Sequence, residues 1–230
     1  MRYQNVIPAV FLARPNRFVA HVEVDGVKGT VHVKNTGRCR ELLVPGCRVY
    51  LSCSDNPTRK TKYDLIAVEK KRENDTLLIN MDSQIVNDAA EEWLHTGAFV
   101  SPDATIRREV TYGASRFDFY IEDGARKIFL EVKGVTLEKD GVASFPDAPT
   151  ERGVKHLHEL IDCMRVGYEA YVLFVVQMKG ITAFFPNDEM HPAFGEALRT
   201  AQSKGVGILA KDCKVLPDSI TIDGDISIIL

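Results

Sequence analysis

The stretch "RFDFYIEDGARKIFLEVKG", residues 116–134, has the pattern of two β-strands joined by a tight turn. Apolar and polar residues alternate on both sides of Asp123-Gly124, a dipeptide typical of hairpin turns. With a two-residue loop at Gly124 and Ala125, the residue numbers of the two partners in each cross-strand pair add up to the same value. This register predicts one wholly apolar side, formed by the pairs Phe117 and Val132, Phe119 and Leu130, and Ile121 and Ile128.

The other side of the predicted hairpin carries charged residues. Asp118 faces Glu131, and Lys133 follows two residues later on the same face. Because opposed like charges destabilise a sheet, this pair indicates a nearby cation. Asp118, Glu131 and the Val132 carbonyl would bind Mg²⁺ or Mn²⁺, which polarises a phosphate and activates a bound water. With Lys133 neutralising charge on phosphate oxygens, the pattern favours metal-assisted phosphodiester cleavage. The alternative is solvated surface charge with Lys133 as an ion-pair partner.

The composition is that of a soluble globular protein. Of the 230 residues, 45% are hydrophobic and 27% are charged. We find no apolar run of membrane-spanning length and no signal-peptide pattern at the N-terminus, so a cytoplasmic location is expected. The five cysteines form no C-x-x-C pair, which favours reduced thiols over a disulfide framework or a zinc site.

The first part of the chain is basic and rich in short strands. Residues 1–80 contain 14 Lys and Arg against 8 Asp and Glu, whereas residues 81–230 contain 15 against 24. Gly26, Gly29, Pro45-Gly46 and Asn56-Pro57 separate the predicted strands. These strands are 6–13, 17–25, 27–34, 47–53, 62–70 and 76–80. They predict a domain over residues 1–81 that is a small Greek-key β-barrel of the OB type, with other small barrels as alternatives.

From residue 82 the pattern changes to a mixture of helices and strands. Helices are predicted near 82–97, 150–166 and 191–204. Strands are predicted near 104–112, 116–122, 127–135, 170–178 and 206–214. This order predicts a second domain over 82–230 with a mixed sheet flanked by helices, so the chain is α+β or α/β overall.

Basic residues in the barrel predict a surface for nucleic acid, since Lys and Arg supply phosphate contacts. They gather near the first turn, around "KNTGRCR" and in "TRKTK". The candidates are Arg14, Arg17, Lys34, Arg38, Arg40, Arg59, Lys60 and Lys62. The alternative is an ordinary solvated set of charged loops.

Three residues near the expected metal site are further candidates for nucleic-acid contacts. Arg116 shares a strand face with Asp118, and Arg152 and His156 lie one turn apart, off the apolar stripe, at a helix start. The alternative for the last two is an ordinary helix start capped by Asp147 or Thr150. Glu92 is expected as an additional carboxylate at the site.

The element order, with Asp118 and the Glu131-x-Lys133 triplet, resembles the PD-(D/E)xK nuclease superfamily. Over nearly its whole length the chain also resembles the sugar fermentation stimulation protein family. The resemblance rests on "NTGRCRELLVPG" (35–46), "SDNPTRKTKY" (54–63), "SRFDF" (115–119), "EVKGVTL" (131–137), "FPDAPTERGVKHLHEL" (145–160) and "PNDEMHPAFGEAL" (186–198). It implies an OB-like domain, a nuclease-like domain, DNA binding and a role in regulating sugar utilisation genes. Where the family pattern has Cys-Pro before "NTG", this chain has Val33-Lys34.

Three functions are compatible with these features. The first is a Mg²⁺- or Mn²⁺-dependent nuclease acting on DNA, with RNA as an alternative substrate. The second is a non-catalytic DNA-binding regulator of sugar (maltose-type) utilisation genes that retains the nuclease-like fold. The third is a binding module with a purely structural cation site. Asp118, Glu131 and Lys133 together favour the first, because a binder without turnover has no need for opposed carboxylates. No membrane partner is predicted, and a homodimer is compatible with the sequence.

Overall fold

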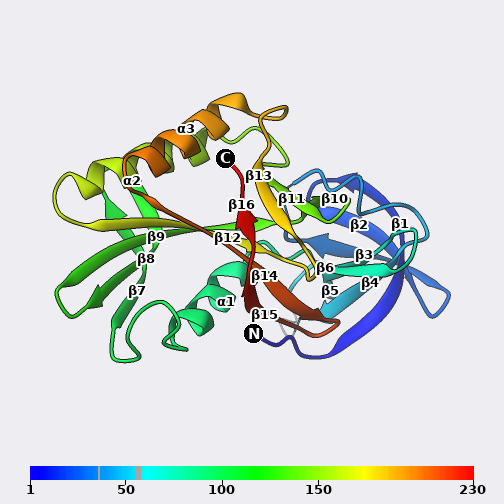
Figure 1. Ribbon diagram of the computed structural model, residues 1–230. Coiled ribbons are helices and arrows are strands. Elements are labelled where there is room, and N and C mark those ends of the chain that lie inside the picture. The colour runs from blue at the N-terminus through cyan, green and yellow to red at the C-terminus, as the bar shows by residue number, and fades with distance from the viewer. Residues whose placement is uncertain (36, 55–57) are drawn as a thin grey trace.

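The computed structural model describes residues 1–35, 37–54 and 58–230, and the predicted turn at Asn56-Pro57 lies outside these residues. Figure 1 shows a β-barrel formed by the N-terminal part of the chain beside a larger domain that contains all three helices. Along the described chain, no helix is both long enough and apolar enough to cross a membrane. The five cysteines are free thiols.

The N-terminal domain is an OB-like closed barrel of five strands, as predicted. The barrel strands are β1 (Val6–Asn16), β2 (Val19–Val24), β3 (Val27–Val33), β4 (Arg48–Cys53) and β5 (Tyr63–Lys71). Parallel pairing of β3 with β5 closes the barrel, and β6 (Thr76–Asn80) continues the sheet beyond β5. Alternating side chains such as Phe11, Val22 and Leu51 fill its interior because successive residues of a strand face opposite sides.

The C-terminal domain is built on a mixed sheet with the strand order β15-β14-β12-β9-β8-β7. These strands are β7 (Thr105–Tyr112), β8 (Ser115–Asp123), β9 (Arg126–Val135), β12 (Glu169–Val176), β14 (Gly207–Leu216) and β15 (Ser219–Asp225). The helices are α1 (Ile85–Leu94), α2 (Glu151–Met164) and α3 (Pro192–Ser203). In both views α2 and α3 cover one face of this sheet and α1 covers the other. The predicted mixed sheet flanked by helices is therefore confirmed.

Several short strands were absent from the prediction. A small second sheet contains β10 (Leu137–Lys139), β11 (Val142–Phe145), β13 (Ala183–Pro186) and β16 (Ser227–Ile228). This sheet lies next to the barrel, and the chain leaves it through residues 146–150 to enter α2. It therefore places the segment before α2 between the two domains.

Polar contacts hold the barrel against the C-terminal domain. The Gln177 amide donates to Asn80 Oδ1 and to the Asp82 carbonyl, in both cases at 3.0 Å. Lys70 of β5 pairs at 2.5 Å with Glu138 of β10, whose side chain is fully buried. These contacts fix the position of the barrel relative to the large sheet.

Candidate functional site

The β8–β9 hairpin has the predicted register. Phe119 pairs with Leu130 and Ile121 with Ile128, and the ladder runs down to Asp123 and Arg126. Gly124 in the turn has a φ of 61°, a conformation that glycine adopts without strain. The hairpin therefore places Asp118 and Glu131 on neighbouring strands, next to the point where the ladder ends.

The backbone pairing between β8 and β9 ends at Phe119, and beyond it the Asp118 side chain bonds to the backbone of β9. Asp118 Oδ2 accepts a hydrogen bond of 2.8 Å from the backbone N–H of Val132. Glu109, on the other side of β8, has a φ of 57°, and no pairing joins it to Asp118 in the described ladder. The backbone is thus irregular around Asp118.

The predicted wholly apolar side is wrong for Phe117. This ring contacts Phe129 and His156, whereas Phe119, two residues later, belongs to the cluster packed against α1. The irregularity around Asp118 breaks the simple alternation, so Phe117 and Phe119 point to opposite faces of the sheet.

Glu131 lies at the centre of the site and is only 3% exposed. Its Oε1 accepts hydrogen bonds from Lys133 and from His156 Nδ1, the latter at 2.5 Å. Its Oε2 is buried and has no hydrogen-bond partner among the described residues. Burial raises the pKa of Glu131, but Lys133 and His156 outweigh it and hold the pKa below its usual value. Glu131 is therefore an anion with one oxygen still to be satisfied.

The pKa of Asp118 is shifted in the opposite direction from that of Glu131. Burial and the nearby Glu131 charge raise its pKa to about 6, against smaller opposing effects of its hydrogen bonds and of Lys133. One of these hydrogen bonds, from Asn87 Nδ2 of α1 to Asp118 Oδ1, is 2.8 Å long. A positive charge at this place would favour ionisation of Asp118.

Helix α2 supplies the second wall of the site. Thr150 caps its start by accepting a hydrogen bond from the Gly153 N–H, as one of the predicted alternatives had it. Arg152 Nε donates to His156 Nε2 at 3.3 Å, so Nδ1 of His156 carries the hydrogen donated to Glu131. His156 is only 3% exposed, and its predicted position off the apolar stripe is wrong. It faces Glu131, while Arg152 is exposed.

The residues present fit a partly hydrated divalent cation. Within residues 1–35, 37–54 and 58–230, no three His, Cys, Asp or Glu side chains form a complete metal cage. Mg²⁺ is usually held by only one or two carboxylates and keeps several waters. The partnerless Glu131 Oε2 and the neighbouring Asp118 carboxylate match this requirement. The Val132 N–H binds Asp118, and the role of the Val132 carbonyl stays a prediction.

Three of the predicted basic residues have structural contacts within the chain. The Arg14 guanidinium donates to four carbonyls at 2.7–2.9 Å, those of Arg17, Asn35, Gly37 and Arg38. Arg59 binds Asp64 through both terminal nitrogens. Lys34 lies 3.1 Å from Asp82 and 3.6 Å from Asp64. These cations shape the loops of the barrel.

The other basic candidates lie on the surface. Arg17, Arg38 and Arg40 are exposed and line, together with Arg14, a hollow of about 470 Å³, which we call the arginine hollow. Lys60 and Lys62 are also exposed, just before β5. Arg116 is exposed and forms a 2.6 Å ion pair with Glu109. The structure thus gathers four arginines at one place and leaves Lys60, Lys62 and Arg116 elsewhere.

The sequence analysis did not identify Asn87 as a residue of the site, and its expectation that Glu92 belongs to the site is wrong. Asn87 orients Asp118 from α1, although an asparagine in a helix gives no signal of this role. Glu92, the carboxylate expected at the site, pairs instead with the N-terminal amine of Met1. It therefore contributes nothing to the cluster around Glu131.

Comparison with known proteins extends over the full chain. Residues 12–79 match the family described as SfsA N-terminal OB domain, and residues 84–219 match the sugar fermentation stimulation protein RE domain. A sugar fermentation stimulation protein homolog of Clostridium beijerinckii is 52% identical over 230 residues, 100% of both chains. One from Desulfitobacterium hafniense is 58% identical over 220 residues, 96% of this chain and 94% of that protein.

A solved structure is similar to the whole fold. The Pyrococcus furiosus SfsA structure, described as a complex with Ca²⁺, superposes with a TM-score of 0.88 at 29% sequence identity. The match covers 100% of this chain and 98% of that one. On these grounds, the chain belongs to the sugar fermentation stimulation protein family.

Proposed function

We propose that this chain is a DNA-binding protein whose C-terminal domain hydrolyses phosphodiester bonds with Mg²⁺ or Mn²⁺. The observation that carries the proposal is the buried Glu131 carboxylate, whose Oε2 has no partner in the described chain and which lies close to Asp118. Burying a polar atom without a partner is costly unless a ligand completes it. A cation held between the two carboxylates would satisfy this atom.

Two further observations support a divalent cation. The Pyrococcus furiosus relative is described as a complex with Ca²⁺, an ion that binds to the same kind of oxygen ligands. The layout of Asp118, Glu131 and Lys133 on β8 and β9 also resembles the PD-(D/E)xK nucleases. Asp118, Glu131 and the Val132 carbonyl would hold the ion, which when bound supplies Lewis acidity and lowers the pKa of a coordinated water.

The other residues of the site orient its charged groups. Lys133 is 18% exposed and bonded to Glu131, so its ammonium can reach a phosphate oxygen and neutralise developing charge. His156 and Asn87 hold Glu131 and Asp118 in place through hydrogen bonds. Such supporting contacts keep ligands in a productive orientation. Arg152 is exposed beside His156 and is positioned to contact the phosphate backbone.

We assign the DNA backbone to the arginine hollow of the barrel. Arg17, Arg38 and Arg40 form no ion pair with a described residue, so their charge is available to phosphates. Arginine suits this role because its planar donors match phosphate oxygens. Lys60 and Lys62 would extend the contact. RNA is the alternative polymer because the phosphates of DNA and RNA are alike and contacts to them do not read the 2′-hydroxyl.

Cleavage of labelled nucleic acid tests the catalytic part of the proposal. Single- and double-stranded DNA and RNA are incubated with the purified chain in EDTA, Mg²⁺ or Mn²⁺. We expect metal-dependent cleavage that falls by about 10²–10³-fold in Lys133→Ala, since this lysine stabilises charge in the transition state. Lys127→Ala, an exposed lysine on the same strand, is the matched control. Cleavage that is equal in Lys133→Ala would contradict the assigned role.

A second candidate is a non-catalytic DNA-binding regulator of sugar utilisation genes. The observation in its favour is that Lys133 and His156 already compensate the charge of Glu131 from within the chain. The family name refers to the stimulation of sugar fermentation, which agrees with a role in sugar utilisation. DNA binding without cleavage of any polymer, under all three metal conditions, would favour this candidate.

The salt dependence of DNA affinity tests the binding surface. Replacing Arg38, Arg40 and Lys60 by alanine removes up to three phosphate contacts. The slope of log affinity against log salt concentration should then become shallower by about 0.9 for each phosphate that the variant no longer neutralises. Lys28→Ala, an exposed lysine on β3, is the control. An unchanged affinity and slope would remove the barrel from the binding surface.

A further inference from the structure

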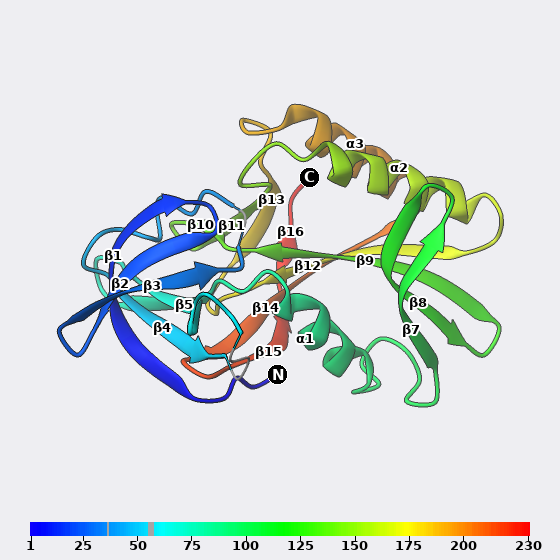
Figure 2. The same cartoon turned by 180° about the vertical axis from the view of Figure 1, so that it is seen from behind.

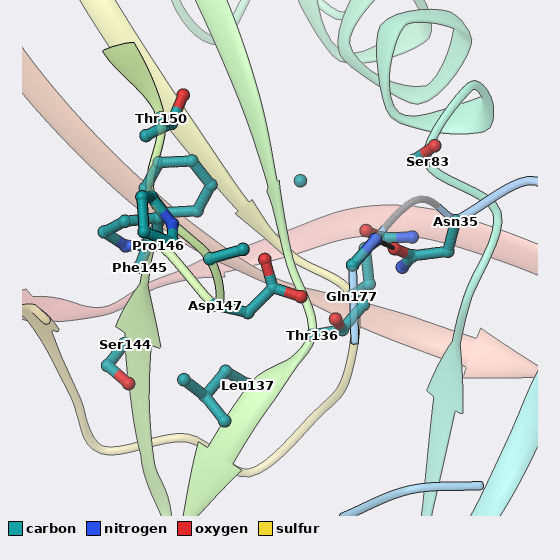
Figure 3. A pocket seen from close by; sticks show the side chains of 14 residues that line it. Asn35, Ser83, Thr136, Leu137, Ser144, Phe145, Pro146, Asp147, Thr150 and Gln177 are labelled. Atoms are coloured by element: carbon teal, nitrogen blue, oxygen red, sulfur yellow. Dashed lines mark hydrogen bonds between the residues drawn. The ribbon is translucent and has the colours of Figure 1, made fainter. Parts of the chain in front are cut away.

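A pocket of about 280 Å³ lies between the barrel and the C-terminal domain. The barrel contributes Asn35 and Gly37, while strand β9, the small sheet and the segment before α2 contribute most of the remaining wall. Figure 3 shows Asp147 near the middle of this view, with Asn35 and Gln177 on one side and Phe145 and Pro146 on the other. The pocket is at the small end of the range for ligand sites, large enough for one base and too small for a base pair.

The pocket presents hydrogen-bonding groups of both kinds. Asn35 Oδ1 accepts from the Gly37 N–H at 2.8 Å, which leaves Nδ2 without a partner among the described residues. Gln177 uses its Nε2 on Asn80 and Asp82, so its Oε1 is an acceptor turned towards Gly134. The Asp147 carboxylate, half-buried beside Gly37, adds a second acceptor.

The remaining walls are apolar or carry hydroxyl groups. Phe145 and Pro146 form one side, and Ser144, the residue before Phe145 on β11, pairs with Leu137 of β10. At two positions of the lining only glycine leaves room for the neighbouring side chain. A Cβ atom on Gly37 would come within 1.9 Å of Asp147 Oδ2, and one on Gly134 within 2.6 Å of Gln177 Oε1. An aromatic and proline wall next to amide and carboxylate groups is the environment that proteins use to hold an unstacked base.

The pocket lies between the two parts of the proposed nucleic-acid surface. It shares Gly37 and Ala148 with the arginine hollow. On its other side, Gly134 directly follows Lys133 on β9, and Thr150 caps the helix that carries Arg152 and His156. A strand whose phosphates lie along the arginine hollow and at Lys133 would therefore pass over the pocket mouth.

We propose that this pocket binds one unstacked nucleobase with an exocyclic amino group, from the nucleic-acid strand held at the arginine hollow and at Asp118 and Glu131. The proposal rests on the proposed function, because that function brings the strand to the pocket. Asp147 and Gln177 Oε1 are acceptors that pair with the amino groups of adenine, cytosine or guanine, and the Asn35 amide donates to a ring nitrogen or carbonyl. Thymine and uracil have no amino group to offer.

An abasic scan tests the pocket without any need for cleavage. Affinities of short single-stranded DNAs, each with one base removed at a different position, are measured in EDTA, where the strand stays intact. We expect one position at which removal of the base weakens binding about tenfold, the effect typical of one buried base. In Ser144→Phe, which fills the pocket, that position should lose its effect, whereas Ser203→Phe on the exposed end of α3 should keep it.

Base substitution at the position found by the scan tests the assigned chemistry. The wild-type chain should bind adenine, cytosine or guanine there more tightly than thymine. Asp147→Asn keeps the shape but replaces an acceptor oxygen by an amide donor, so it should reduce this preference. This variant also tests the pocket if Ser144→Phe does not fold.

The outcomes separate the pocket from the proposed function. A flat scan with normal strand affinity, or a base preference that Asp147→Asn leaves unchanged, would overturn the pocket and leave DNA binding intact. Failure of the wild-type chain to bind any strand would overturn both proposals. A position-specific effect that disappears in Ser144→Phe supports the pocket even if no cleavage is observed.

Discussion

At the scale of single residues, Asp118 and Glu131 differ in how the chain treats their charge. Lys133 and His156 donate directly to Glu131 and hold its pKa below the usual value. The hydrogen bonds that Asp118 accepts from described residues come from neutral donors, and its pKa is raised to about 6 by burial and by the charge of Glu131. Two carboxylates with pKa values shifted in opposite directions are typical of functional sites.

The titration of Asp118 in the metal-free chain is therefore a direct prediction. Its side-chain ¹³C resonance should titrate near pH 6, and the midpoint should move down in Glu131→Gln because the neighbouring charge is gone. A raised carboxyl pKa means that ionisation of Asp118 lowers stability as pH rises from about 4 to about 6. Asp118→Asn should lose this part of the pH dependence. A midpoint near 4 in the wild-type chain would contradict the described environment.

The sequence predicted Asp118, Glu131 and Lys133 as one cluster, but it missed Asn87 and gave His156 another role, contact with nucleic acid. Alternation in two strands was sufficient to place Asp118, Glu131 and Lys133, because hairpin register follows from a two-residue turn. The direction of Phe117 depends on backbone irregularity around Asp118, which alternation does not encode. Asn87 reaches Asp118 only through the packing of α1 on the sheet, a tertiary contact beyond any local pattern.

At the scale of secondary-structure elements, α1 and α2 approach the site from opposite faces of the sheet. α2 brings His156 to Glu131, and α1 brings Asn87 to Asp118. Long amphipathic helices and the apolar strand β12 were predictable from their periodicity. The strands of the small sheet have only 2–4 residues each and, apart from the β10–β11 hairpin, pair across long stretches of chain, so local sequence carries little signal for them.

Asn87→Ala tests the contribution of α1. Removing its hydrogen bond should raise the pKa of Asp118 further, because this bond favours the ionised form. Metal-dependent cleavage should fall by about 10–100-fold, the usual effect of removing a side chain that orients a metal ligand. Glu91→Ala, one turn further along α1 and paired with Arg108, is the matched control. Equal losses in both variants would indicate general damage to the helix.

At the scale of the whole molecule, the position of the barrel depends on charged contacts with the C-terminal domain. Burial raises the pKa of Glu138, but Lys70, the Gly141 N–H and Arg72 outweigh it and hold the pKa below its usual value. Lys70 and Arg72 belong to the barrel half of the chain, whereas Glu138 lies on β10. This cluster therefore ties the β5 end of the barrel to the small sheet of the C-terminal domain.

Glu138→Gln should destabilise the fold by about 3 kcal/mol at pH 7, because it leaves the partly buried Lys70 without its counter-ion. A depressed carboxyl pKa contributes stability above the ordinary pKa of 4.5 that is lost as pH falls through the folded-state value. The difference in the free energy of unfolding between the wild-type chain and Glu138→Gln should thus shrink below about pH 4. Urea unfolding at several pH values measures this. Glu122→Gln, in an exposed pair with Arg107, should cost less than about 1 kcal/mol, and an equal cost for both would contradict the role of Glu138.

Calorimetric titration with Mn²⁺ is the most direct measurement of whether Asp118 and Glu131 form a cation site. It uses only the purified chain and cannot be mimicked by a trace of contaminating nuclease. We expect the wild-type chain and Glu122→Gln to bind Mn²⁺ alike, and Asp118→Asn and Glu131→Gln to lose that binding. Unchanged Mn²⁺ affinity in both site variants would contradict the metal site and return the two carboxylates to a structural role.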